Sequence, residues 1–460
     1  MSGYIEDLLT RPEGKTLEFK RDLSSPQNVL KTATAFANTA GGIVLIGVED
    51  SSRAVVGVEN VRDEEERLCN LIADSIAPRL APNVQIANWK GRTLLLIEVY
   101  PSAQRPHWLR SMGMENGALV RVGSTNRQAD APLRAEMQRS ALNLCYDEQP
   151  MPDINPEVLD LRVPSGLFAG LREWNENSAE NLNLLTRHQG RVVPTIGGVL
   201  LFGTVRERYF SDAWIQCGRF RGTNKVAILD QQDVRDHLPL ALERAFDFVK
   251  KHAMCSAEFG DLRRKDVWNV PLEAIREALT NAIVHADYSQ IGGPIRVAIF
   301  DDRIEVENPG LLMPGMTFSN IREGVSMLRN RVIGRVFKEL GLIEQWGSGF
   351  QRMVDSCQAI HLPEPVFEEV AFRFRVTFGL KRVAATSRGD TTPEKIMALI
   401  RAGEADGGVS SQYLSQTLGI SGRTMRDHLS RLIKAEQIVM IGKSTYDPNK
   451  RYLPVKRESE

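Results

Sequence analysis

The chain has 460 residues, of which 42% are hydrophobic, so it can bury large cores, and a prior of roughly 100 to 200 residues per domain predicts about three domains. Its 58 basic and 58 acidic residues cancel, which excludes a chain-wide basic field and leaves only a local patch for nucleic-acid contact. The sequence has no long apolar run, no leader peptide and no C-x-x-C pair among its 5 cysteines. We therefore expect a cytoplasmic protein with reduced thiols and no membrane contact.

Two breaks in composition predict the domain boundaries. Pro150, Pro152 and Pro156 follow a helical segment, and proline cannot continue a helix. Residues 384–395 are small and polar, and they separate a strand-like run from a helical one. We expect an α+β multidomain chain with a first domain at 1–148, a small adaptor at 149–235, a third domain at 236–383 and a carboxy-terminal module at 391–460.

The first domain begins with a short strand and a helix that feeds a second strand. In residues 16–20 the period of two places Glu18 and Lys20 on one face. Residues 28–38 have the apolar spacing of a helix, a Gly-Gly pair breaks it, and residues 43–48 have the pattern of a buried strand. Further strands are expected over 93–102 and 117–126, with a closing helix over 134–144.

Three spaced motifs of this domain carry a resemblance to a known family. They are E-x4-E-F-K at 13–20, AFANTAGG at 35–42 and GVED at 47–50. Together they resemble the Alba-like domain of the Schlafen family, over about residues 10–140. The resemblance implies an Alba-like α+β fold with a surface for nucleic acid.

The same resemblance implies a metal-dependent ribonuclease site in Glu13, Glu18 and Asp50. Three converging carboxylates would hold a divalent ion, Mg²⁺ or Mn²⁺, that activates water, with Lys20 in contact with phosphate. The alternative is structural: Glu18 and Lys20 form an ordinary solvated strand face, and Asp50 caps a turn.

The adaptor carries weaker signals. We expect helical segments at 163–186, a glycine-punctuated apolar strand at 194–203 and a second strand within 211–225. The Gly-Gly pair lacks the G-K-[ST] of a Walker motif. This stretch is interpreted as architectural, with Arg219, Arg221 and Lys225 as minor nucleic-acid candidates.

The third domain contains an unusual amphipathic helix at 270–289. Leu272, Ile275 and Leu279 share its apolar face, whereas a polar row recurs every four residues, at Glu273, Glu277, Asn281 and His285. An apparent hairpin over 292–310 follows, and Gly347-Ser348-Gly349 then opens a helix near Phe350. Glycines at a helix start let backbone N–H groups and the positive end of the helix dipole approach a phosphate.

Five motifs of this region carry a second resemblance. In chain order they are E-x3-N, DDRIEVENPG, RN at 329–330, GLIE and GSG. Together they resemble the divergent ATP-binding domain of the gyrase and histidine-kinase (GHKL) superfamily, over about residues 265–375. The resemblance implies an α/β sandwich that binds ATP and Mg²⁺ beneath a lid over 311–328. It places the magnesium ligand at Asn281, a general base at Glu277, the first glycine box at Asn308 and Gly310, and the phosphate loop at Gly347, Ser348 and Gly349. His285 and Asp287 are further pocket candidates.

One departure from that superfamily stands out. ENPG replaces its usual D-x-G-x-G box, so the aspartate that reads the adenine amino group is missing. A degenerate fold kept as a scaffold or dimerisation surface is therefore the alternative to nucleotide binding.

The carboxy-terminal module has the pattern of a helix-turn-helix. One helix spans 392–402, Ser410 begins a second, and residues 419–421 form the turn into a third that carries Met425, Leu429, Leu432 and Ile433. With the hairpin-like end, the module resembles the winged helix of bacterial regulators, although many winged helices bind proteins instead. The basic candidates for nucleic-acid contact are Arg423, Arg426, Arg431, Lys434, Lys443, Lys450 and Arg451.

These patterns predict a nucleotide-responsive nucleic-acid-binding protein, an ATP-binding transcriptional regulator that binds DNA as a homodimer or larger oligomer. The competing hypothesis is a Schlafen-type endoribonuclease that cleaves RNA or tRNA in stress or phage defence under control of the nucleotide domain. A third is a catalytically silent scaffold.

Overall fold

The computed structural model describes residues 2–50, 52–171, 173–175, 177–253, 255–259, 264–343, 347–380, 392–403, 407–435, 437–442 and 450–455. The chain divides into two compact units, Met1–Lys381 and Arg382–Glu460. Within the described residues, none of the helices has both the length and the apolar character that a membrane span requires.

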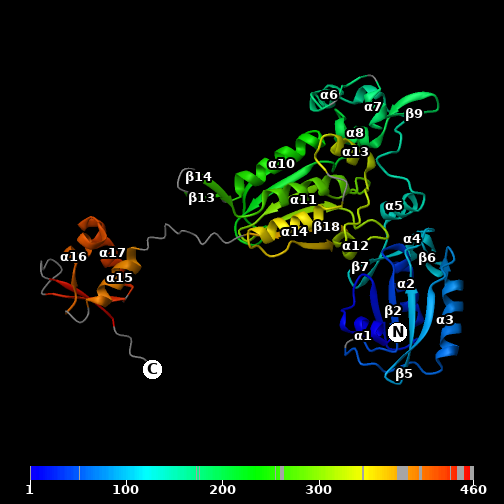
Figure 1. Ribbon diagram of the computed structural model, residues 1–460, viewed down its shortest axis with the longest axis horizontal. Helices are drawn as coiled ribbons and strands as arrows, with labels where there is room; N and C mark the ends of the chain where they lie inside the picture. Colours follow the sequence, from blue (N-terminus) through cyan, green and yellow to red (C-terminus); the bar gives the residue numbers. More distant parts are fainter. Residues whose placement is uncertain are drawn as a thin grey trace. The chain divides into compact units, whose positions relative to one another are not determined.

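The amino-terminal region, coloured blue to cyan in Figure 1, is built on a four-stranded sheet in the order β1-β2-β5-β4. Its strands are β1 (Leu17–Lys20), β2 (Gly42–Ile46), β4 (Asn83–Trp89) and β5 (Arg92–Val99), and only the β1–β2 pair is parallel. Helices α2 (Pro26–Asn38) and α3 (Val61–Ser75) pack on one face, and α1 (Ser2–Thr10) packs on the other.

Burial on both faces follows from the sequence of β5. Leu95 and Ile97 enter the core shared with α2 and α3, whereas Leu94 and Leu96 enter the core shared with α1. A strand that is buried on both sides has a continuous apolar run. The strands predicted over 16–20, 43–48 and 93–102 and the helix at 28–38 are confirmed, whereas the strand predicted over 117–126 is divided by a turn into two paired strands. Gly41, with φ of +74°, follows α2 in a conformation that favours glycine.

Smaller elements complete this region and lead into the adaptor. They are β3 (Ile76–Ala77), β6 (Trp108–Leu109), η1 (Arg110–Met112), α4 (Gly113–Gly117), β7 (Leu119–Val122), β8 (Thr125–Gln128) and α5 (Ala131–Ala141). The adaptor contains η2 (Pro156–Val158), α6 (Arg162–Leu167), α7 (Ser178–Asn181), β9 (Leu185–His188), β10 (Arg191–Pro194), α8 (Ile196–Phe202) and α9 (Arg206–Tyr209).

The prediction of a strand over 194–203 is wrong, because these residues form helix α8. The Thr195 side chain accepts a hydrogen bond from the Gly198 N–H at 2.9 Å and so begins the helix. Each of the residues of α8 is buried, so its sequence is apolar on all sides and has no helical period. Gly198 lies so close to the Leu184 backbone that a Cβ would approach the Leu184 carbonyl oxygen to 2.2 Å.

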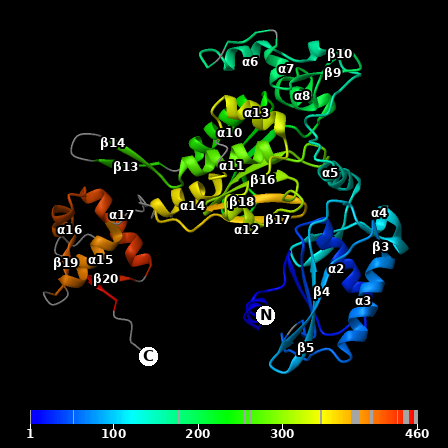
Figure 2. The same cartoon turned by 45° about the vertical axis from the view of Figure 1, so that its right-hand side comes forward.

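The third region is a six-stranded sheet in the order β12-β11-β15-β16-β18-β17. Helices α10 (Leu238–His252), α11 (Leu272–His285) and α14 (Gly349–Ala359) lie side by side over one face (Figures 1 and 2). The strands are β11 (Ile215–Phe220), β12 (Ile228–Val234), β15 (Ile295–Ile299), β16 (Arg303–Pro309), β17 (Val366–Val370) and β18 (Arg373–Gly379). Two of them, β11 and β12, come from the stretch predicted to be the adaptor.

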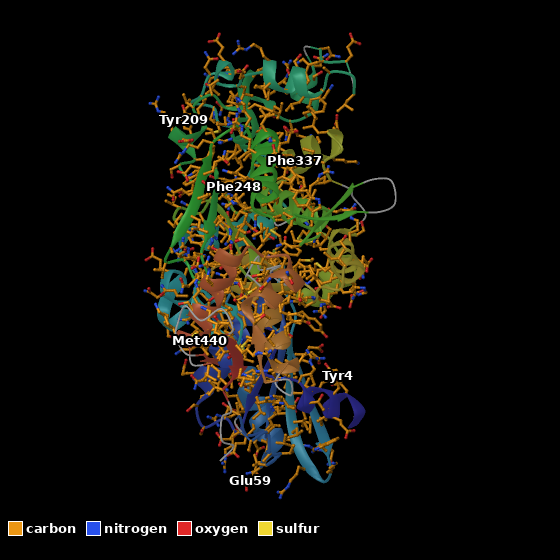
Figure 3. All side chains as sticks on the ribbon, turned by 90° about the vertical axis from the view of Figure 1, so that its left-hand side faces the viewer. Tyr4, Glu59, Tyr209, Phe248, Phe337 and Met440 are labelled. Carbon is orange, nitrogen blue, oxygen red and sulfur yellow. The ribbon has the colours of Figure 1, made fainter. Side chains whose placement is uncertain are left out.

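The core of this region lies between the sheet and its helices. Figure 3 labels two of its side chains, Phe248 of α10 and Phe337 of α13 (Arg331–Glu339), which are 3% and 0% exposed. The predicted helix at 270–289 and hairpin at 292–310 are confirmed as α11 and β15–β16. The remaining elements are α12 (Phe318–Arg322), β13 (Cys255–Phe259) and β14 (Arg264–Trp268).

The described residues of the second unit form three helices and a three-stranded sheet in the order β19-β21-β20. Its elements are α15 (Thr392–Ala402), β19 (Val409–Ser410), α16 (Ser411–Leu418), α17 (Gly422–Lys434), β20 (Ile438–Ile441) and β21 (Arg451–Pro454). The predicted start of α16 at Ser410 is confirmed, since its side chain accepts from the Tyr413 N–H at 3.2 Å. Ser421, at the end of the predicted turn, caps α17 by accepting from the Thr424 N–H at 3.2 Å. Met425, Leu429 and Leu432 are buried in the core.

Candidate nucleotide and nucleic-acid sites

A cavity of about 160 Å³ lies between α11, β16, residues 311–327 and the start of α14. Three members of the polar row of α11, Glu277, Asn281 and His285, line it, whereas the fourth, Glu273, is exposed. Pockets that hold small ligands typically measure about 300 to 1,000 Å³. The cavity is therefore smaller than a typical ligand pocket, and movement of the segment above it would enlarge it.

Glu277 and Asn281 lie one turn apart on α11 and are joined by a hydrogen bond. The Asn281 amide donates to Oε1 of Glu277 at 3.1 Å, and Oε2 of Glu277 pairs with the Arg352 guanidinium at 2.9 Å. This arrangement leaves the amide oxygen of Asn281 as a neutral ligand beside a carboxylate. Oxygen ligands of this kind suit Mg²⁺.

The predicted glycine loop approaches the cavity from α14. Gly349 lies against Glu277, and a Cβ at Gly349 would stand 2.1 Å from Glu277 Oε1. Gly347 has φ of +66°, and a Cβ there would stand 1.9 Å from the Gly324 carbonyl oxygen. Ser348 begins α14 without a side-chain capping bond. Both glycines are therefore needed for close backbone approach, one to Glu277 and one to the lid.

Asn308 and Gly310, at the end of β16, have different surroundings. Asn308 lines the cavity, is 4% exposed, and donates to the Pro309 carbonyl at 3.0 Å. Gly310, with φ of +103°, makes room for Arg329, since a Cβ would lie 2.5 Å from Arg329 Nη1. Asp287, expected as a pocket residue, does not line the cavity, and its carboxylate accepts hydrogen bonds from Ser289 and Gln290.

The rest of the cavity wall is apolar and aromatic. Phe350, Phe367 and Phe374 line it, and the rings of Phe350 and Phe367 lie 4.5 Å apart. Methionines from the lid and from α14 extend this wall: Met313, Met316, Met327 and Met353. Flat aromatic and flexible thioether side chains suit a planar ring such as a nucleobase.

Arg329 and Glu136 form a buried ion pair behind the cavity that the sequence patterns did not predict. Arg329 Nε donates to Glu136 at 2.7 Å, and its other nitrogens donate to the His285 and Leu311 carbonyls at 2.6 Å each. Burial raises the pKa of Glu136 to about 7, although Arg329 opposes the shift. Burial, reinforced by the charge of Arg329, lowers the pKa of His285 to about 4.

In the amino-terminal region, Lys20 bridges two of the three predicted acids. Its ammonium lies 2.7 Å from Glu18 Oε1 and 3.1 Å from Asp50 Oδ2. The other oxygen of Glu18 accepts from Arg121, which is 1% exposed and also donates to the Gly14 carbonyl. The sequence patterns did not identify Arg121 as a residue of this site, although a single arginine inside an otherwise apolar strand indicates a buried ion pair.

Glu13 does not join the other two acids, because its carboxylate accepts from the Phe19 backbone N–H at 2.8 Å and so stabilises the start of β1. Throughout the described residues, no three His, Cys, Asp or Glu side chains are grouped to hold a metal ion. The expected metal triad of Glu13, Glu18 and Asp50 is therefore not assembled in this structure.

The basic candidates of the second unit gather on α17. Arg426, Arg431 and Lys434 are exposed there. Arg451 donates to the Gly408 carbonyl at 3.0 Å, and Lys450 is half-buried. The side chain of Arg423, all of Lys443 and Glu344 of the GLIE motif lie outside the described residues.

Two family models match parts of the chain. Residues 13–130 match the family described as "Schlafen, AlbA_2", and residues 292–378 match the family described as "Putative ATP-dependent DNA helicase recG C-terminal". The chain therefore contains a Schlafen AlbA_2 region and an ATPase-like region. The second match begins after α11, which carries Glu277 and Asn281.

The chain is also similar to individual proteins. An uncharacterized ATP-binding protein of Ureaplasma parvum is 31% identical over 88 residues, which are 19% of this chain and 24% of that protein. The chain thus matches about a quarter of the length of this curated relative.

Two solved structures are similar over different extents. A crystal structure of a Corynebacterium diphtheriae protein is 17% identical, covers 98% of this chain and 99% of its own, and has a TM-score of 0.41. The amino-terminal domain of a RecG-related protein from Nitrosomonas europaea is 25% identical, covers 28% of this chain and 92% of its own, and has a TM-score of 0.23. Scores of this size do not establish a shared fold.

Proposed function

We propose that this protein binds ATP with Mg²⁺ in the cavity beneath residues 311–328, binds nucleic acid, and acts as a transcriptional regulator whose affinity for DNA depends on the bound nucleotide. The observation that carries the proposal is that Glu277, Asn281 and the glycine loop meet at one cavity. The ATPase-like match and the ATP-binding relative from Ureaplasma parvum support it.

The cavity wall divides by chemistry in a way that suits ATP. Asn281 and Glu277 supply oxygen ligands for Mg²⁺, and the start of α14 supplies backbone N–H groups and the positive end of a helix dipole for phosphates. Phe350, Phe367 and Phe374 supply ring surface for the base. Asn308 stands where an aspartate would read adenine, and an amide can both accept and donate at a base edge.

Binding to nucleic acid is supported in both units. The Schlafen AlbA_2 match covers the amino-terminal region, and the family that matches residues 292–378 is described as "Putative ATP-dependent DNA helicase recG C-terminal". In the second unit, the described helices α15, α16 and α17 together with the small sheet β19-β21-β20 support a winged helix, with Arg426, Arg431 and Lys434 of α17 exposed for phosphate. A homodimer would present two such helices to two half-sites of DNA.

Calorimetric titration with ATP and Mg²⁺ tests the nucleotide site. The wild type is expected to bind, and Asn281→Ala to weaken binding by about 10-fold or more, since one charge-assisted contact contributes roughly 1.5 to 3 kcal/mol. Glu273→Ala is the matched control, because Glu273 lies on the same polar row of α11 but outside the cavity. Absence of binding heat for the wild type would overturn the proposal.

Binding of duplex DNA, measured by fluorescence anisotropy with and without ATP, tests the regulatory part of the proposal. DNA affinity should change when ATP is added to the wild type and remain unchanged for Asn281→Ala. If the wild type and Asn281→Ala bind DNA with the same affinity, both with and without ATP, the proposal that the nucleotide controls DNA binding is refuted.

Lys20 supports a second candidate, the metal-dependent ribonuclease. Glu18 and Asp50 both reach its ammonium, so the two acids are close enough to share one cation. Purified protein is incubated with tRNA, mRNA and duplex DNA in Mg²⁺ or Mn²⁺. Cleavage that is lost in Asp50→Asn would establish the nuclease and displace the regulator. Asp50 is the safer position, because its side chain is 54% exposed, whereas Glu18 partners buried Arg121.

A further inference from the structure

The first part of the lid, residues 311–316, lies between the nucleotide cavity and the amino-terminal region. Its side chains Leu311, Leu312, Met313 and Met316 line the nucleotide cavity and also a second, smaller cavity. The opposite wall of the second cavity comes from the amino-terminal region, with Lys15, Thr39 and Glu136 among its residues. One short segment therefore contacts the proposed ATP site on one side and the Schlafen AlbA_2 region on the other.

Two hydrogen bonds donated by backbone N–H groups of this segment hold it against neighbouring elements. The Gly315 N–H donates to the Thr39 carbonyl at the end of α2, at 2.8 Å. The Leu312 N–H donates to Oε1 of Glu369 on β17, also at 2.8 Å. If the lid moves to admit a nucleotide, these two bonds have to break or change partners.

Glu369 also holds Lys15 of the amino-terminal region. The Lys15 ammonium lies 2.5 and 2.6 Å from the two carboxylate oxygens, and the two side chains are only 13% and 3% exposed. Burial lowers the pKa of Lys15, while Glu369 opposes the shift. A buried ammonium depends on its partner, so loss of the carboxylate strongly disfavours this arrangement.

Lys15 is placed to affect the candidate nucleic-acid site. It lies in the turn that leads to β1, next to Gly14, whose carbonyl accepts from Arg121 at 3.0 Å. Arg121 in turn pairs with Glu18, and Glu18 pairs with Lys20. A shift of Lys15 therefore acts on a turn that is directly bonded to the Arg121–Glu18 pair.

We propose that residues 311–316, the Lys15–Glu369 ion pair and the Gly315–Thr39 hydrogen bond form a latch that links the two sites. ATP needs the lid to open, opening releases Lys15 and Thr39, and the release changes the affinity of the Schlafen AlbA_2 region for nucleic acid. Linkage requires the reverse effect as well: nucleic acid changes the affinity for ATP by the same factor. The proposal rests on ATP binding in the cavity and names how that binding is transmitted.

The first test weakens the latch and measures ATP affinity by calorimetry in the full-length protein. Lys15→Met and Glu369→Gln each remove the ion pair, so they lower the cost of opening and should tighten ATP binding by about 5-fold or more, within the usual range of allosteric coupling. The double variant should equal the single variants, because each already breaks the same pair. Lys251→Met is the matched control, since it breaks the Lys251–Asp230 pair, which lies at α10 and β12.

The second test uses amide hydrogen exchange, first in the wild type with and without ATP and then in Lys15→Met. ATP added to the wild type should speed exchange at the Leu312 and Gly315 amides and alter exchange around Lys15. Without ATP, Lys15→Met should already show faster exchange at the same two amides. Lys251→Met should behave like the wild type.

The outcomes separate this inference from the function on which it rests. If the wild type binds ATP but Lys15→Met and Glu369→Gln keep its affinity and its exchange pattern, the latch is refuted and ATP binding stands. If DNA or tRNA leaves ATP affinity unchanged in the wild type, the proposed transmission is also refuted. If the wild type does not bind ATP, the proposed function and the latch fall together.

Discussion

Arg329 joins three parts of the first unit through a single buried side chain. It donates to Glu136 of α5, to the carbonyl of His285 in α11 and to the carbonyl of Leu311 in the lid. All three contacts need the guanidinium, because a lysine has no fork of donors in one plane. The sequence motif RN marked the position, but its partners lie 18 to 193 residues away.

Replacement of Arg329 by methionine should be strongly destabilising. It leaves Glu136 buried without its partner, so we expect the free energy of unfolding to fall by about 3 to 5 kcal/mol. Urea denaturation followed by circular dichroism measures this loss. Arg329→Met combined with Glu136→Leu should recover part of it, since no carboxylate is then left unpaired. Arg187→Met, which breaks the exposed Arg187–Glu180 pair, should change stability by less than about 1 kcal/mol.

His285 should make the first unit sensitive to acid. Its pKa falls to about 4 in the folded state, first through burial and then through Arg329, so between pH 6.5 and 4 the unfolded chain binds more protons. The free energy of unfolding therefore decreases on acidification, by up to about 3 kcal/mol from this group. Glu136, with a pKa raised to about 7, acts in the opposite direction between about pH 4.5 and 7.

His285→Gln separates these two contributions, because Glu136 is present in both proteins. Urea denaturation at pH 7, 5.5 and 4 should show a smaller loss of stability on acidification for the variant than for the wild type. Parallel pH profiles would show that His285 titrates normally in the folded protein.

Single residues also show where sequence reasoning was sufficient and where it was not. The polar row of α11 was visible because it repeats every four residues, and three of its four members line the cavity. Arg121, Glu136 and Glu369 were not visible as site residues, since their partners are 103, 193 and 354 residues away. Such pairs depend on the packing of separate elements, which no local period encodes.

At the scale of elements, amphipathic helices and alternating strands were predictable, but α8 was not. A segment with apolar residues on every side has no period that distinguishes a helix from a buried strand. The face of β1 has a similar limit: the structural alternative to the metal site places Glu18 on a solvated strand face, yet Glu18 is 8% exposed and pairs with buried Arg121. The environment of the Glu18 side chain therefore depends on an ion pair with another element, and the alternation of residues along the strand does not predict it.

The contact between the glycine loop and the lid gives an element-scale prediction. Gly347→Ala places a methyl group where the Gly324 carbonyl now lies, and it also requires a non-glycine residue at positive φ. Gly341→Ala is the matched control, since Gly341 has a similar φ of +68° but open space around its Cβ position. Both variants should lose about 1 kcal/mol or more from backbone strain.

Only Gly347→Ala should also disturb the lid. We expect it to alter ATP affinity and to speed amide exchange in residues 320–325, whereas Gly341→Ala retains both. Thermal unfolding measures the loss of stability that the two variants share, and calorimetric titration measures the ATP affinity of each. Equal ATP affinity for the two variants would mean that the lid does not rest on the glycine loop.

At the scale of the whole molecule, a neutral chain has to concentrate its attraction for nucleic acid locally. The 58 basic residues are balanced by 58 acidic ones, and in the first unit many form ion pairs, such as Arg375–Glu307 at 2.8 Å on β18 and β16. Three exposed basic side chains on one helix of the second unit, α17, are a different arrangement. Exposed basic side chains can neutralise DNA phosphates and so release the bound counterions. Basic side chains that are already paired with carboxylates do this less well.

The salt dependence of DNA binding tests this difference in the full-length protein. Each phosphate contact contributes about 0.9 to the slope of log affinity against log salt concentration. The triple variant Arg426→Ala, Arg431→Ala, Lys434→Ala should therefore weaken binding and reduce the slope by about 2 to 3, while ATP affinity is unchanged. Lys395→Ala, an exposed lysine of α15, is the control and should keep the slope. If the triple variant keeps the wild-type slope, then DNA does not bind to α17 and is held by another surface, such as the amino-terminal region.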